Sequence, residues 1–344
     1  PAGYLKLNTF NLPDSSIVKG NEYMDATLYN GSAGSVTVTN AAGFQPDMVW
    51  MKARSGGVTN HAMVDSVRPS GYALYPNITS NEANNSTLFT GITSTGLTLA
   101  GGNSTFSNPT YTYVGWQWKA GGTAVSNTAG TITSSVSANP TAGFSIVVYT
   151  GNGIMGATVG HGLGVTPQVV LIKQRTTAGH HWKSIFPILG AGKALYLNLT
   201  NAEAAGQWNN TLPSSTVFTV DNDTNDNENT ASHVAYCFAD VEGYSKFGKY
   251  TGNGSADGPF VYTGFRPAYL MVKRADAVND WYMYDSARDK YNLTTQQLYP
   301  NLSNAEAANN NSLDLLSNGF KIRTTGLALN ASGGTYIFMA FAEN

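Results

Sequence analysis

The sequence predicts an all-β fold made of three tandem β-sandwich repeats that resemble jelly rolls, each with one short helical turn. Three observations support this prediction. Ordered landmarks occur three times along the chain. Short runs of β-branched and aromatic residues alternate with Gly-, Asn- and Ser-rich connections. No long amphipathic helical pattern is found in the sequence. The 344 residues are 42% hydrophobic and only 12% charged, which argues against intrinsic disorder.

The first landmark is a strand that ends in a glycine turn. Tyr-Thr-Gly-Asn-Gly stands at 149–153 and again at 250–254, and a degenerate copy, Tyr-Asn-Gly, stands at 29–31. The run before the second copy, 144–149, is rich in β-branched and aromatic residues, which favours a strand.

The second landmark is a Gly-x-x-Pro turn followed by an apolar run that ends in lysine. The prolines are Pro46, Pro167 and Pro267. The runs that follow at 48–52, 169–173 and 269–273 are short and continuous, as expected for strands buried on both faces.

The third landmark is Ser/Thr-x-x-Glu, at 79–82, 200–203 and 303–306. This is the pattern of a capping box, in which a hydroxyl and a carboxylate satisfy the free amides of a helix start. It therefore predicts the one helical turn in each repeat.

The fourth landmark is a closing strand at 114–119, 234–239 and 337–342, where large apolar residues alternate with period two. Together the landmarks place repeats at 23–120, 143–241 and 242–344. The Gly-, Ser- and Thr-rich segment 121–142 is interpreted as a linker that adds an edge strand. The second and third repeats follow each other directly, so close packing between them is expected.

Five runs (43–52, 150–153, 251–265, 316–320 and 334–343) resemble a family of tandem-repeat virion structural proteins of tailed bacteriophages. The family is tail-fibre-like, is common in phages of aquatic bacteria, and resembles this chain from about Tyr23 onward. The resemblance implies a non-enzymatic protein of the virion surface, made in the host cytoplasm. The favoured role is a tail fibre or tail-tip component that contacts the host. The alternative is a capsid decoration or head fibre that stabilises the head or adheres to glycans.

A third class, a glycan depolymerase, is less favoured because it needs clustered carboxylates, and the acidic residues here are dispersed. The expected partners are other virion proteins, a bacterial surface glycan or protein receptor, and further copies of the chain, with a trimer favoured. A net charge of −2 argues against nucleic acid as a partner. No apolar stretch approaches the roughly 20 residues of a membrane helix, so membrane insertion is not expected.

Three groups of residues are candidate sites. Trp182, Trp208 and Trp281 lie near expected loops and could stack on sugars, with core packing as the alternative. Asp221, Asp223 and Asn225 resemble the start of a calcium loop, with a solvated polar loop as the alternative, and otherwise no cofactor is expected. In the segment 1–22, an expected assembly anchor could add a strand to a partner's sheet through four apolar residues: Leu5, Leu7, Phe10 and Leu12.

Two smaller patterns have a structural and a chemical interpretation. Asp65 and Asp285 each stand three residues before an arginine, Arg68 and Arg288, at matching places in the first and third repeats. They could supply acid–base chemistry or brace a turn. Cys237, the single cysteine, is interpreted as a small packing residue in a closing strand.

Overall fold

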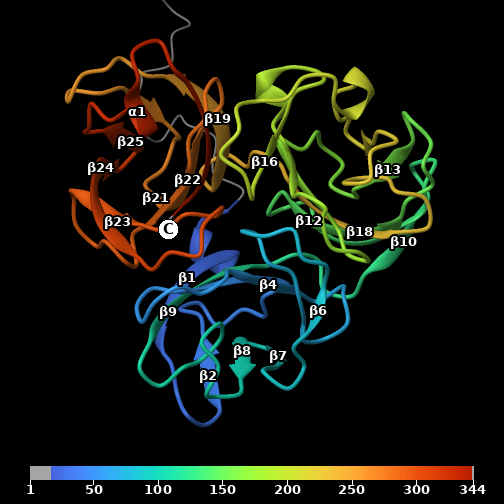
Figure 1. Ribbon diagram of the computed structural model, residues 1–344, viewed down its shortest axis with the longest axis horizontal. Coiled ribbons are helices and arrows are strands. Elements are labelled where there is room, and N and C mark those ends of the chain that lie inside the picture. Colours follow the sequence, from blue (N-terminus) through green and yellow to red (C-terminus); the bar gives the residue numbers. More distant parts are fainter. Residues whose placement is uncertain (1–16, 343–344) are drawn as a thin grey trace, which may run out of the picture.

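The computed structural model describes residues 17–342, and Figure 1 shows three lobes around a common centre, one for each sequence repeat. The all-β prediction is confirmed, because strands dominate the described residues and the helical elements are single turns. These turns are η2 (Gly20–Glu22), η3 (Pro187–Leu189), η4 (Trp208–Asn210) and α1 (Leu327–Asn330).

The main sheet has the same antiparallel order in every repeat: first strand, closing strand, Gly-x-x-Pro strand, and the strand after it. In the first repeat these are β1 (Met24–Asn30), β9 (Thr112–Trp118), β3 (Met48–Ala53) and β4 (Ala62–Asp65). In the second they are β12 (Phe144–Thr150), β18 (Ser232–Phe238), β14 (Val169–Gln174) and β15 (Lys183–Ile185). In the third they are β19 (Ser245–Thr251), β26 (Thr335–Ala342), β21 (Pro267–Arg274) and β22 (Trp281–Asp285).

A second sheet accompanies the main sheet of each repeat. It consists of β2 (Val36–Thr39), β8 (Gly96–Leu99) and β7 (Phe89–Thr93) in the first repeat, and of β13 (Thr158–Gly160) and β17 (Val217–Thr219) in the second. In the third it consists of β20 (Phe260–Tyr262), β25 (Gly319–Ile322), β24 (Ala307–Leu316) and β23 (Thr294–Gln297). Buried side chains of both sheets form one cluster in the first repeat and another in the second, which is β-sandwich packing.

Additional short strands extend this plan. The segment 121–142 contributes β10 (Val125–Asn127) and β11 (Ser134–Asn139), which lengthen the main sheet of the second repeat beside β12. At the opposite edge, β16 (Ala194–Tyr196) completes seven strands. In the first repeat β5 (Tyr72–Ala73) pairs with β6 (Ala83–Asn84).

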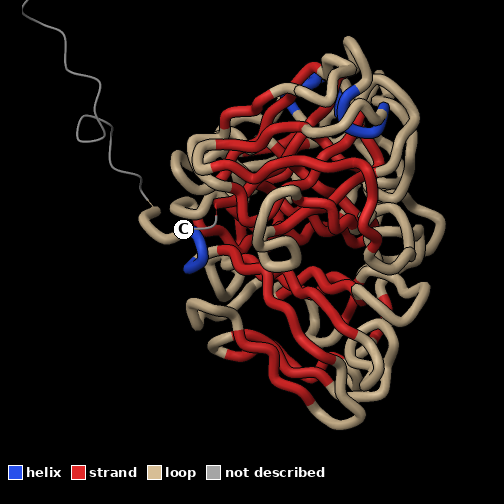
Figure 2. Tube along the Cα trace, turned by 90° about the vertical axis from the view of Figure 1, so that its left-hand side faces the viewer, coloured by secondary structure: helices blue, strands red, loops and turns tan. Residues whose placement is uncertain are grey.

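The three repeats share one hydrophobic core. The largest buried cluster draws side chains from all three main sheets. At its centre the last aromatic residues of the closing strands, Trp118, Phe238 and Phe341, contact one another with ring centroids 5.8–6.4 Å apart. Figure 2 shows strands filling the interior of this body and loops at its periphery. The repeats therefore form one body around a pseudo-threefold axis.

The helical turns expected from the Ser/Thr-x-x-Glu pattern are wrong. No helix covers 79–82, 200–203 or 303–306, all of which lie within the described part of the chain. A capping box needs the amides of its own first turn as hydrogen-bond donors. Here the glutamate amides of all three segments donate to a neighbouring repeat instead.

Candidate functional site: the junctions between the repeats

The three Ser/Thr-x-x-Glu segments cross from one repeat to the next, and we call them straps. The Glu82 amide donates to the Arg175 carbonyl at 3.0 Å, from the first repeat to the second. The Glu203 amide donates to Ala275 at 2.8 Å, from the second repeat to the third. The Glu306 amide donates to the Arg54 carbonyl at 2.9 Å, from the third repeat back to the first. The three junctions close a ring.

The lysine in the penultimate position of each Gly-x-x-Pro strand lies beneath a strap. Lys52, Lys173 and Lys273 are fully buried. Their ammonium groups donate to strap carbonyls of the adjoining repeat at 3.3, 3.5 and 3.3 Å, namely Ser303, Thr79 and Thr200. Their other hydrogen bonds go to carbonyl and hydroxyl oxygens of their own repeat. Burial lowers the pKa of each lysine to about 8.

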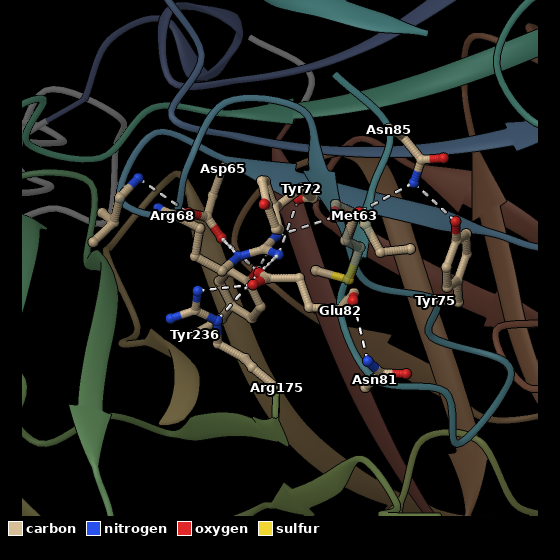
Figure 3. Close-up of polar contacts among 12 residues, drawn as sticks. Met63, Asp65, Arg68, Tyr72, Tyr75, Asn81, Glu82, Asn85, Arg175 and Tyr236 are labelled. Carbon is tan, nitrogen blue, oxygen red and sulfur yellow. Dashed lines mark hydrogen bonds and ion pairs between the residues drawn. The ribbon is translucent and has the colours of Figure 1, made fainter. Parts of the chain in front are cut away.

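At the junction of the first and second repeats, the strap glutamate joins a buried ion-pair network (Figure 3). Arg68 bonds Asp65 at 2.6 Å through Nε and Glu82 at 2.6 Å through Nη1. Arg175 of the second repeat bonds the other carboxylate oxygen of Glu82 at 2.8 Å. The Tyr236 hydroxyl, also from the second repeat, donates to Asp65 at 2.7 Å. Two carboxylates and two guanidinium groups thus balance each other.

The junction of the third and first repeats is built in the same way. Arg288 bonds Asp285 at 2.5 Å and Glu306 at 3.0 Å. Arg54 of the first repeat grips Glu306 with two nitrogens, at 2.8 and 3.0 Å, which is the strong bidentate geometry. The Trp116 indole donates to Asp285 at 3.0 Å and so replaces the tyrosine hydroxyl.

The junction of the second and third repeats lacks this network and keeps only the strap glutamate. Phe186 and Leu189 stand where the other repeats have aspartate and arginine, and Met339 takes the place of Trp116 and Tyr236 on the closing strand. Phe186 and Met339 belong to the shared core. The remaining carboxylate, Glu203, pairs at 2.8 Å with Lys193, and both side chains are partly exposed. At this junction, apolar residues therefore replace the aspartate, the arginine and the hydrogen-bond donor of the closing strand together.

Two of the network carboxylates, Asp65 and Glu306, are stabilised as anions. Burial alone would raise the pKa of Asp65, but the Arg68 guanidinium and the Tyr236 hydroxyl hold the pKa below its usual range. In the same way Arg54 and Arg288 outweigh burial and lower the pKa of Glu306. Acid–base catalysis near neutrality needs a carboxyl whose pKa lies close to the working pH. These groups are suited to fastening repeats, which is the structural interpretation of the Asp–Arg pairs.

The three candidate tryptophans lie in the interior, with exposed fractions of 0% for Trp182 and Trp281 and 1% for Trp208. The Trp182 indole donates to the Tyr75 carbonyl of the first repeat at 2.9 Å. The Trp281 indole donates to the backbone carbonyl of Tyr196 in the second repeat at 3.1 Å. None of these rings offers a face to a sugar, so their positions do not support the glycan hypothesis and agree with core packing.

Lys183 occupies the centre of the candidate calcium loop. Its ammonium group lies 2.7 Å from Asp221 and 3.6 Å from Asp223. Asp221 also accepts the Trp208 amide at 2.6 Å. The side-chain oxygen of Asn225 accepts a hydrogen bond from the His181 amide at 2.6 Å. An internal cation therefore stands where the calcium hypothesis places a metal, and among the described residues no group of three or more acidic, His or Cys side chains is arranged for a metal.

No sequence pattern indicated the contact of Lys183 with Asp226, or the contacts of the strap glutamates with a neighbouring repeat. The available signal was a lysine in a short strand run that ends in Ile185 and Phe186, at the position of Ala62 and Tyr282 in the other repeats. The four anchor residues, Leu5, Leu7, Phe10 and Leu12, lie outside the described residues. Cys237 is fully buried, and burial raises its thiol pKa, as expected for a packing residue.

The fold and its junctions define a class of protein: an all-β body in which three sandwich repeats of one chain close into a ring. The chain belongs to the family described as a domain of unknown function (DUF7483), whose model matches residues 19–344. Searches of curated proteins and of solved structures gave no match. No helix of the described residues is long and apolar enough to cross a membrane.

Proposed function

We propose that the protein is a non-enzymatic structural protein of a bacteriophage virion. In this proposal it is exposed on the particle as a tail fibre or tail-tip component that contacts the host surface. The observation that carries the proposal is the use of the thrice-repeated strap glutamates and strand lysines as ties between repeats. Because these residues tie the repeats together at all three junctions, they build a rigid body. A rigid body suits a virion component that bears mechanical load when the particle meets its host.

The resemblance of the five sequence runs to tail-fibre-like virion proteins supports the same role. A chain in which only 12% of the residues are charged also depends little on salt for its interactions, which suits a particle exposed to water of varying salinity. The proposed partners are other virion proteins, bound through residues 1–22, and a glycan or protein receptor on the bacterium.

The ring geometry favours one alternative, a decoration or head-fibre protein on the capsid. Closed symmetric assemblies offer positions of threefold symmetry, and a partner with matching symmetry fits such a position best. A single chain with three equivalent junctions presents this symmetry approximately. A threefold fibre axis in the tail would fit the approximate symmetry of this chain equally well. The location on the particle therefore distinguishes the two roles.

The deciding experiment is antibody labelling of intact particles, read by electron microscopy. The antibody is raised against the exposed loop around Val278, which is 71% exposed, so that binding does not require unfolding. Pre-incubation with the loop peptide serves as the control. Label on the tail or its fibres supports host contact, and label over the head supports decoration. Particles that lack the protein, by labelling and by mass spectrometry of their components, would contradict both roles.

A further inference from the structure

We propose that Lys183 and Asp226 form an intramolecular isopeptide bond that fastens β15 to the loop at 221–228 within the second repeat. The bond would be a covalent modification made by the chain itself. It depends only on the geometry inside this repeat and not on the proposed virion role.

The two reacting groups are in contact and shielded from water. The Nζ atom of Lys183 lies 2.7 Å from Oδ2 of Asp226. Both residues are 0% exposed. The second oxygen of Asp226, Oδ1, is buried and has no hydrogen-bond partner in the described part of the chain. Such an orphan oxygen is costly in a folded interior and calls for an explanation.

The surroundings favour the uncharged form of Asp226, whereas Asp226 and Asp221 raise the pKa of Lys183 above its ordinary value, so the amine becomes free only when a neighbouring carboxylate takes its proton. The apolar cluster between the two sheets of this repeat includes Ile185, Trp208 and Phe218 from the segments that carry and flank the pair. Burial raises the pKa of Asp226 to about 6, even though Lys183 opposes the shift. The Tyr149 hydroxyl donates to the Asp226 carbonyl at 2.6 Å and fixes the loop in place.

Asp221 is placed to relay a proton. Its carboxylate touches the Lys183 ammonium at 2.7 Å. It also accepts the amides of Trp208 and Asn209, at 2.6 and 2.5 Å, so its negative charge is satisfied without Lys183. A carboxylate oxygen in contact with the amine can accept a proton from it and pass the proton to Asp226, which contacts the same nitrogen.

The reaction balances without any co-reactant. The Nζ atom of Lys183, freed of one proton through Asp221, attacks Cγ of Asp226. A C–N bond forms and one C–O bond of the carboxyl group breaks. The departing oxygen leaves as water with two of the three ammonium protons, and the third proton stays on the amide nitrogen. The products are a neutral amide and one water, so a buried ion pair disappears.

The bond would be confined to the second repeat. The positions that align with Lys183 in the other two repeats are Ala62 and Tyr282, which cannot react in this way. The second repeat is also the one that lacks the Asp–Arg pair, with Phe186 and Leu189 in its place. A covalent tie there would brace the repeat in which that internal ion pair is missing.

The test is the intact mass of the full-length purified chain under denaturing conditions. The proposal expects a deficit of about 18 Da, one water, relative to the sequence mass. Tryptic digestion should then yield a branched peptide that joins the segment containing Lys183 to the segment containing Asp226. An intact mass equal to the sequence mass, with no branched peptide, would overturn the proposal.

Two variants locate the bond. Lys183→Arg keeps the positive charge but removes the amine, so the deficit should disappear. Asp223→Asn alters the third and more distant carboxylate, so the deficit should remain. A deficit that persists in Lys183→Arg, or a branch mapped to Asp221 or Asp223, would refute the assignment to Asp226. Because the bond can form only in the folded repeat, the circular dichroism of each variant must match that of the unmodified protein before its mass is compared.

Discussion

At the scale of single residues, three buried lysines show how this fold uses charge. Lys52, Lys173 and Lys273 occupy the penultimate position of equivalent strands, and each has its ammonium group among carbonyl and hydroxyl oxygens. A buried charge without a carboxylate partner costs free energy, which the structure lowers through several hydrogen bonds per lysine. The lowered pKa values record the remaining cost.

These lysines predict how stability changes with alkaline pH. Each folded-state pKa is about 8, against an ordinary value of 10.5, so the unfolded chain binds more protons between these values. The free energy of unfolding should therefore rise as the pH increases from about 8 to about 10. Urea unfolding at several pH values measures this slope.

Lys173→Met should make that slope shallower, because it removes one of the three titrating groups. Lys249→Met, at an exposed position on β19, is the matched control and should leave the slope unchanged. A stability that falls steadily from pH 8 to pH 10 in the unmodified protein would contradict the argument.

At the scale of elements, the straps act as clasps between sheets. Each contributes a backbone hydrogen bond and a carboxylate, but only two of the three carboxylates enter buried networks. The third, on Glu203, forms a partly exposed pair with Lys193. The same sequence pattern therefore has different energetic weight at different junctions.

Glu306→Ala should destabilise the protein strongly, by about 3 kcal/mol. The substitution leaves the guanidinium groups of Arg54 and Arg288 without this carboxylate partner, and the Arg288 group is fully buried. Glu203→Ala removes the equivalent carboxylate from a partly exposed pair and should cost less than about 1 kcal/mol. Both variants keep the strap amide. Denaturant midpoints of the two variants give the comparison, and equal losses would show that the buried network adds nothing.

The junction of the second and third repeats, where apolar residues replace the ion-pair network, gives a second prediction at this scale. Phe186→Asp places an unpaired carboxylate in the shared core and should cost roughly 3–5 kcal/mol. Adding Leu189→Arg and Met339→Tyr rebuilds the arrangement of Asp65, Arg68 and Tyr236 and should recover part of that loss. Thermal unfolding of the single and triple variants tests this coupling. A triple variant less stable than Phe186→Asp alone would show that the three positions do not act together.

At the scale of the whole molecule, the repeats are joined by a common core and not only by linkers. Trp118, Phe238 and Phe341 meet at the pseudo-threefold axis, one from each closing strand. Because every main sheet buries one face there, no repeat can leave without exposing the others. We therefore expect the three repeats to unfold in one cooperative transition.

Trp118→Ala should destabilise all three repeats together, by about 3–5 kcal/mol for a large buried aromatic side chain. Hydrogen exchange read by mass spectrometry should show protection lost in parallel in the first, second and third repeats. Val125→Ala, at a residue that is 66% exposed on an edge strand, serves as the control. Loss of protection confined to the first repeat would mean that the repeats are independent.

Much of the architecture was predictable because it follows from local chemistry repeated three times. Alternating apolar residues and glycine turns determine strands wherever they occur, and thus the all-β class. Four ordered landmarks also indicate three equivalent units. The buried strands that contain Lys52, Lys173 and Lys273 were predictable for the same reason, since a short continuous apolar run between turns favours a strand buried on both faces.

The use of polar residues was decided only by the tertiary structure. The Ser/Thr-x-x-Glu pattern satisfies the local rule for a helix start, yet its amides and carboxylates bind a neighbouring repeat, because ring closure brings residues such as Arg54 and Glu306 together across 252 positions. The candidate tryptophans became buried for the same reason, and Lys183 met the loop at 221–228 only in the folded sandwich. Contacts between residues far apart in sequence leave no periodic signal, so the sequence determined the strands, and the packing of the strands determined the site.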